Sequence, residues 1–170
     1  MLNPKHLGIL LFAALAAQAP SACAHGNARG TARLVLGRTR VAINYGRPRL
    51  NGRNPLELLE PGQLWRLGAD VPTTLETDGP VRIGDKVVPK GTYYLLVWRV
   101  DSTMWRLIVS TQQFNRYEPS TQVAESPMTL STSKIPVDEM AISLLKHEGR
   151  GTIEIAWGKY RLSCPLNPAG

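Results

Sequence analysis

The chain has 170 residues and a formal net charge of +7, with 43% hydrophobic and 6% aromatic residues. This length suits a single domain with one core, and its two cysteines cannot form a stabilising disulfide framework, because Cys23 lies in an expected leader and leaves Cys164 alone. No zinc-knuckle, helix-turn-helix or aromatic-basic RNA motif accompanies the positive charge, so nucleic acid is not an expected partner.

Residues 1–24 are predicted to be an export signal. Lys5 and His6 provide a basic start, residues 7–19 form an apolar run with one glutamine, and small residues follow at 20–24. The run is too short to cross a bilayer. We therefore expect an exported protein that is periplasmic or secreted.

Two cleavage sites are compatible with this leader. Cleavage after Ala24 would leave a soluble chain that begins at His25. Cleavage before Cys23 would leave a cysteine able to carry lipid, although Pro20 stands where that motif has leucine. The alternative is thus an outer-envelope lipoprotein, in which membrane contact runs only through lipid at Cys23.

The expected divisions after the leader are a flexible N-terminus at 25–30, one β-sandwich domain at 31–166 and a tail at 167–170. The N-terminal part is cationic, because seven arginines follow the leader before the first acid, Glu57. These are Arg29, Arg33, Arg38, Arg40, Arg47, Arg49 and Arg53. Such a region favours anionic headgroups, envelope polymers or acidic ligands. The alternative is a solvated basic surface.

Alternating apolar residues predict strands in the first two thirds of the chain. Val41, Ile43 and Tyr45 show the period of two that a half-buried strand requires. Further runs lie at 73–77, 81–83, 86–88, 92–100 and 105–110. Turn residues separate several of them at 84–85, 89–91 and 101–103. Together these runs predict an antiparallel meander.

The C-terminal part repeats the pattern at 140–144, 153–157 and 160–164. A loop is expected at 147–151 and a short link at 158–159. Short strands joined by Gly, Pro and Asp turns, without a long helical period, predict an all-β fold. We expect an antiparallel β-sandwich or flattened barrel of about eight to ten strands. Within it, Cys164 is predicted to be a buried apolar thiol.

Two segments interrupt the strand pattern. Residues 46–62 contain three prolines and are expected to form a structured loop with one helical turn near 56–59. Residues 111–133 are rich in Gln, Ser, Thr and Asn, and a connection of that length is usually functional or mobile. A strand around 127–130 is the alternative for part of it.

Motifs for catalysis, metals and cofactors are missing from the sequence. His25 and His147 are far apart and belong to no ligand pattern, so neither a metal nor a cofactor is expected. Serine-hydrolase elbows, phosphate loops and dinucleotide fingerprints are also absent. An enzyme is therefore the less favoured interpretation, and its form would be a small hydrolase that uses Asp70 with a distant acid or His147.

Four motifs stand out together. They are Asn44-Tyr45-Gly46-Arg47-Pro48, Asn51-Gly52-Arg53, Trp65-Arg66-Leu67-Gly68-Ala69-Asp70 and Val88-Pro89-Lys90-Gly91-Thr92-Tyr93. In order and spacing, from about Thr31 to Trp157, the chain resembles a family of exported bacterial proteins, the domain of unknown function 2911 family. The resemblance implies a fold and an exported location but no established activity.

The chain also departs from that family pattern. Asp70 stands where the family usually has Asn, Val71 replaces an acid and Leu67 replaces a Thr. Residues 54–57 replace an aromatic-glycine step. A function that depends on the family's amide or acid is therefore not carried over to this chain.

The same motifs predict a polar pocket for an anionic or glycan ligand. Its candidate residues are Tyr45, Arg47, Arg53, Trp65, Arg66 and Asp70. An indole would supply a flat apolar floor and the guanidinium groups planar forks for carboxylate or phosphate. In the structural alternative, Trp65 caps the core and Arg66 pairs with Asp70. Trp98, Trp105 and Trp157 are expected in the core or on sheet faces. We thus expect a non-catalytic binding or structural module.

Overall fold

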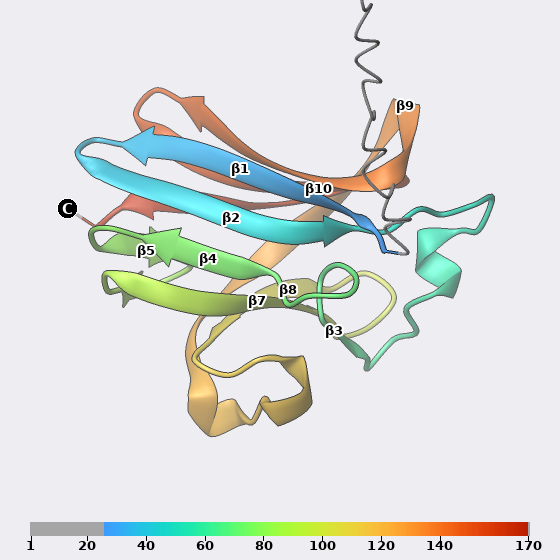
Figure 1. Cartoon of the computed structure of the whole chain (residues 1–170), viewed down its shortest axis with the longest axis horizontal. Coiled ribbons are helices and arrows are strands. Elements are labelled where there is room, and N and C mark those ends of the chain that lie inside the picture. Colours follow the sequence, from blue (N-terminus) through green and yellow to red (C-terminus); the bar gives the residue numbers. More distant parts are fainter. Residues whose placement is uncertain (1–25, 170) are drawn as a thin grey trace, which may run out of the picture.

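Antiparallel strands dominate the computed structural model, which describes residues 26–169 (Figure 1). The strands are β1 (Ala28–Leu36), β2 (Thr39–Arg47), β3 (Leu64–Trp65), β4 (Thr74–Thr77), β5 (Val81–Ile83), β6 (Lys86–Val88), β7 (Gly91–Arg99), β8 (Trp105–Ser110), β9 (Gln122–His147) and β10 (Arg150–Pro168). Helical structure among these residues is limited to the 3-10 turns η1 (Pro55–Glu57), η2 (Phe114–Arg116) and η3 (Pro119–Thr121). The predicted leader and Cys23 lie outside the described residues.

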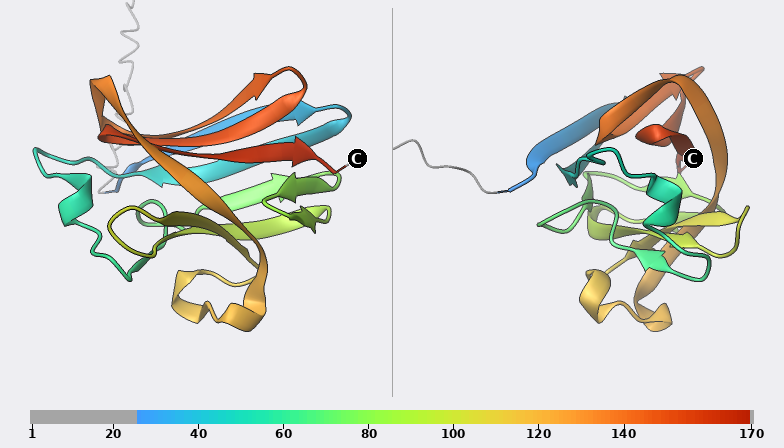
Figure 2. Two further views of the ribbon diagram at one scale, coloured as in Figure 1. Left: turned by 180° about the vertical axis from the view of Figure 1, so that it is seen from behind. Right: turned by 90° about the vertical axis from the view of Figure 1, so that its right-hand side faces the viewer.

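The strands form one sheet that folds over on itself without closing. Its order is β1-β2-β4-β7-β8-β9-β10-β5-β6, with β3 added to β7. Figures 1 and 2 show β1, β2, β4 and β7 as one layer and much of β9 and β10 behind it. The predicted all-β sandwich is confirmed, and so is a helical turn inside the loop at 46–62. A closed barrel is not formed.

The predicted meander is wrong in one respect, because the β5–β6 hairpin leaves the first layer. β4 pairs directly with β7, whereas β5 pairs with the end of β10, residues 166–168. The hairpin turn at 84–85 is confirmed. Val81, Ile83 and Val88 are all fully buried, so this hairpin gains its burial by packing in the second layer.

The second layer contains two long, bent strands, β9 and β10, where the sequence pattern predicts several shorter ones. β10 is continuous through Gly158, where the register with β9 shifts and φ is +58°, so the expected link at 158–159 is a bulge in one strand. Residues 122–133, expected to be mostly connection, begin β9. Ala124, Ser126 and Met128 are buried in alternation there, and small or polar side chains made that alternation weak in the sequence.

The two ends of the domain are also more ordered than expected. β1 begins at Ala28, within the segment predicted to be a flexible N-terminus. β10 continues to Pro168, within the predicted tail, because its last residues pair with β5. Backbone pairing with a neighbouring strand therefore orders residues whose side chains carry little strand signal.

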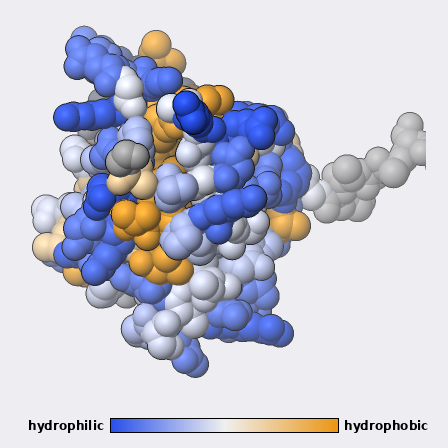
Figure 3. Space-filling view, turned by 90° about the vertical axis from the view of Figure 1, so that its left-hand side faces the viewer, coloured by the Kyte–Doolittle hydropathy of each residue, from blue (hydrophilic) through white to orange (hydrophobic). Residues whose placement is uncertain are grey.

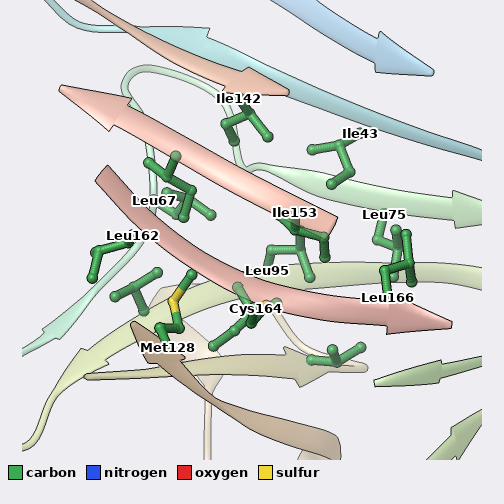
Figure 4. Packing of buried hydrophobic residues seen from close by; sticks show 14 of the residues in the cluster. Ile43, Leu67, Leu75, Leu95, Met128, Ile142, Ile153, Leu162, Cys164 and Leu166 are labelled. Atoms are coloured by element: carbon green, nitrogen blue, oxygen red, sulfur yellow. The ribbon is translucent and has the colours of Figure 1, made fainter. Parts of the chain in front are cut away.

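The core lies between the inner faces of the two layers (Figure 4). Ile43, Leu75, Leu95, Leu107, Ile153 and Leu166 are fully buried there. Cys164 is free and buried as predicted, and burial raises the pKa of its thiol to about 12 while a hydrogen bond with Ser126 opposes the rise. Among residues 26–169, no helix has the length and apolar character needed to cross a membrane.

Candidate functional site

Tyr45 lies in the core rather than on a surface. Its ring packs against Gly30 on β1, and its hydroxyl donates a hydrogen bond to the Ile142 carbonyl oxygen at 3.2 Å. Its exposed fraction is 5%. This tyrosine joins the two layers and is not placed to touch a ligand.

Arg47 and Arg53 hold the loop at 46–62 in place. Arg47 forms an ion pair with Glu139 on β9 at 2.8 Å, and Arg49 pairs with the same carboxylate at 3.0 Å. Arg53 donates to the carbonyl oxygens of Leu50 and Arg49. Their guanidinium groups are therefore engaged within the protein, in contacts that fix the loop against the bend of β9.

Trp65 belongs to an aromatic corner of the core. Its ring stacks on Trp157 with centroids 5.5 Å apart and planes 6° from parallel. Because β3 pairs Trp65 with the buried Val97, this side chain shares the inner face of the layer. Leu56, Leu59, Trp105 and Tyr160 line the same corner. This arrangement agrees with the structural alternative for Trp65.

Arg66 and Asp70, by contrast, line a hollow of about 220 Å³ on the outer face, here called the Arg66 pocket. The remaining lining residues are Pro72, Thr73, Tyr94, Leu95, Leu96, Gln113, Phe114 and Asn115. They come from the β3–β4 loop, from β7 and from the loop that carries η2. Of the six predicted site residues, Arg66 and Asp70 line this pocket and the other four do not.

The β3–β4 loop owes its shape to three residues with positive φ. These are Leu67 at +50°, Gly68 at +124° and Asp70 at +62°. Leu67 is fully buried in the core (Figure 4), and the Thr73 hydroxyl donates to its carbonyl oxygen. Asp tolerates the left-handed region better than most residues, and Gly is favoured at the more extreme angle. The loop is thus anchored at its centre, so Arg66 sits on a fixed support.

Asp70 is paired with the N-terminal end of the domain and not with Arg66. Its Oδ2 accepts hydrogen bonds from the Asn27 amide nitrogen at 2.6 Å and from Asn27 Nδ2 at 3.2 Å. These bonds lower the pKa of the Asp70 carboxyl, and the charge of Arg66 adds to the effect. No ion pair within residues 26–169 joins Arg66 to Asp70, so the predicted internal pair is not formed.

The Arg66 side chain is exposed and keeps most of its donors available. Its Nε donates a long hydrogen bond of 3.4 Å to the Gly68 carbonyl oxygen. Its two Nη groups donate to none of the described residues. A guanidinium held by one bond at its base can present its planar fork to a carboxylate or phosphate.

The floor and far wall of the Arg66 pocket come from residues that the sequence motifs missed. Tyr94 and Leu96 project from the outer face of β7, and the loop after β8 supplies Phe114 with the amides of Gln113 and Asn115. That loop is fixed by Thr111 N donating to the Thr121 carbonyl oxygen at 3.0 Å. In the sequence, only the polar composition and the length of this loop indicated that it could have a functional role.

Asp70 and His147, the two residues considered for a hydrolase, lie in different parts of the structure. Asp70 is the only carboxylate among the residues lining the Arg66 pocket, and its lowered pKa keeps it ionised and unable to donate a proton near neutral pH. His147 lies at the tip of the β9–β10 hairpin, exposed beside Glu148. Neither His147 nor a second carboxylate therefore lines the Arg66 pocket beside Asp70.

Residues 28–166 match the family model described as "Protein of unknown function (DUF2911)", and the chain therefore belongs to this family. The resemblance of the four motifs is thereby confirmed. No curated protein and no solved structure matches the chain.

Proposed function

We propose that this protein acts outside the cytoplasm as a non-catalytic binding module, and that its Arg66 pocket accepts a carboxylate-bearing sugar. The observation that carries the proposal is the exposed Arg66 fork beside an aromatic wall and two side-chain amides. A carboxylate suits the fork, sugar C–H groups suit Tyr94 and Phe114, and hydroxyl groups suit the amides. Export by the leader at 1–24, with release or lipid attachment at Cys23, is part of the proposal.

The hydrogen-bond donors of Arg66 that no described residue uses support an anion in this pocket. Asp70 is the one acid among the described residues that line the pocket, and its Oδ2 accepts two hydrogen bonds from Asn27 and none from Arg66. The ionised Asp70 carboxylate offsets part of the charge of Arg66, but the two Nη groups of Arg66 remain free to donate to an incoming carboxylate. Tyr45, Arg47, Arg53 and Trp65 have a structural role in this proposal, because their polar or aromatic groups are engaged within the protein.

The test compares D-galacturonate with D-galactose, which differ by the carboxylate, in an NMR titration of the purified protein. We expect galacturonate to shift the resonances of residues lining the Arg66 pocket, and galactose to bind more weakly. Arg66→Ala should weaken galacturonate binding about tenfold or more, since a charge-assisted bidentate pair is lost. Arg66→Lys should restore only part of it, because an ammonium lacks the planar fork.

Two results would contradict this function. One is equal binding of galactose and galacturonate by the natural protein. The other is equal binding of galacturonate by the natural protein and Arg66→Ala, provided that both show the same thermal unfolding midpoint.

A further inference from the structure

A second and larger hollow lies on the same outer face as the Arg66 pocket. It encloses about 800 Å³ and crosses β1, β2, β4 and β7 near the end where the β1–β2 hairpin turns. We call it the outer groove. Its lining residues are Arg33, Leu34, Val35, Arg40, Val41, Ala42, Glu76, Thr77, Asp78, Lys90, Gly91, Thr92 and Lys146.

The sheet register places the two hollows next to each other. Thr92 of the outer groove and Tyr94 of the Arg66 pocket are two residues apart on β7, so their side chains point to the same face. A single cross-strand row lies at the border of the two hollows. Its members are paired in the order Thr31, Asn44, Thr74 and Tyr94. Tyr94 itself belongs to the Arg66 pocket. The hollows are therefore consecutive parts of one surface.

Cations on the outer groove are only partly neutralised. Arg40 pairs with Asp78 at 2.7 Å, and Glu76, which accepts a hydrogen bond from the neutral Asn44 at 3.1 Å, keeps a negative charge of its own. Lys146 donates to the Val35 carbonyl oxygen, which satisfies a hydrogen bond but leaves its charge unbalanced. Arg33 and Lys90 form no ion pair with any residue in 26–169. The groove thus carries a net positive charge at its rim.

The floor between these cations is apolar. Val35 is half exposed, and Ala42 and the Thr92 methyl group lie in the same hollow. Figure 3 views the molecule from the hairpin end, at the left of Figure 1, and shows that apolar residues also lie between hydrophilic ones on that end. A ligand that fits must combine anionic groups with C–H surface along its length.

We propose that the outer groove and the Arg66 pocket together bind an extended acidic polysaccharide, with one uronic acid unit at Arg66 and further units toward Arg33 and Lys90. This inference rests on the proposed function of the Arg66 pocket. Four residues along β7 and three strand spacings across the sheet are perpendicular displacements, so the diagonal between the two ends is roughly 20 Å, which is long enough for several sugar units. Sugar rings match the apolar floor with their C–H faces, whereas polyphosphate offers no such surface.

The experiment measures affinity by calorimetry for oligogalacturonates from the disaccharide to the octasaccharide. The natural protein should bind longer oligomers progressively more tightly until the path is filled. Replacing both groove cations, in the variant Arg33→Gln with Lys90→Gln, should weaken the longest oligomer roughly three- to tenfold and leave galacturonate unaffected. The matched control, Lys134→Gln with Lys159→Gln, removes equal charge at the exposed bend of β9 and β10 and should behave like the natural protein.

The outcomes separate the two proposals. If the natural protein binds galacturonate but binds longer oligomers no more tightly, the proposal for the groove is wrong and that for the Arg66 pocket still holds. If the natural protein does not bind galacturonate, the proposal for the Arg66 pocket is wrong. Equal effects of the groove and control variants would indicate a non-specific attraction to charge and overturn the groove. Tighter binding of polyphosphate, or of anionic lipid vesicles, than of the octasaccharide would also overturn it.

Discussion

Trp65 and Arg66 are neighbours in the chain, yet they belong to different regions of the molecule. Trp65 stacks on Trp157 inside the aromatic corner, and Arg66 lines a pocket on the outer face. Successive side chains of an extended segment point to opposite faces of a sheet, so a layer of backbone separates the two. Adjacent residues of one motif can therefore differ in role, because one packs in the core and the other faces a hollow on the surface.

The largest effect on the free energy of unfolding is expected in the aromatic corner. Trp157→Ala should lower the free energy of unfolding by about 3–5 kcal/mol, because a mostly buried ring and its stacking partner lose their packing. Arg66→Ala should change it by less than about 0.5 kcal/mol, as is usual for an exposed side chain. Urea unfolding of both variants measures the difference. Similar losses of stability would show that Arg66 is also part of the scaffold.

A smaller effect is expected at the ion pairs that hold the 46–62 loop. Glu139→Gln removes the charge shared by Arg47 and Arg49, and we expect a loss of about 1 kcal/mol because these side chains are partly exposed. The chemical control is Glu118→Gln, which changes an exposed acid that forms no ion pair within 26–169. An unchanged urea midpoint for Glu139→Gln would mean that two backbone hydrogen bonds between the loop and β9 suffice to hold the loop, one from Leu50 N to the Asp138 oxygen and one from Met140 N to the Pro48 oxygen.

The smallest effect concerns Asp70, whose pKa lies below the ordinary value of 3.8 because Asn27 donates to the carboxylate. A lowered pKa in the folded state stabilises the fold above 3.8, and this contribution is lost as the pH falls through the lowered value. Asp70→Asn keeps a residue that tolerates positive φ but removes the titrating group. Its stability should therefore change less with pH in this acid range than that of the natural protein, as acid unfolding would show. An identical acid limb in both proteins would contradict the assignment.

Parts of the fold could be predicted because their signal is local. Val41, Ile43 and Tyr45 alternate regardless of which strands lie beside them, and all three are buried in β2. Asp101 also acts locally, since its carboxylate accepts from the amide nitrogens of Thr103 and Met104 in the predicted turn after β7. Such patterns depend on side-chain period and turn chemistry alone.

Other parts depend on distant partners and left little trace in the sequence. Ala124 and Ser126 are buried at the start of β9 because β8 lies beside them, although neither residue is strongly apolar. Tyr94 and Phe114 meet at the Arg66 pocket only because the loop after β8 approaches the outer face of β7. Two of the six predicted site residues, Arg66 and Asp70, share that pocket, and the other four make contacts with partners far along the chain or in its loops.

The sequence by itself determined that this protein is an antiparallel β-sandwich of one family, because side-chain alternation, turn residues and motif spacing are properties of short segments. Only the tertiary structure decided which face each residue occupies relative to the core, and hence that Trp65 packs inside while Arg66 points outward. It also decided that β5 and β6 join the second layer and that the two hollows are consecutive on one face. These outcomes depend on pairing between segments that are distant in the chain, where burial of apolar surface selects the arrangement.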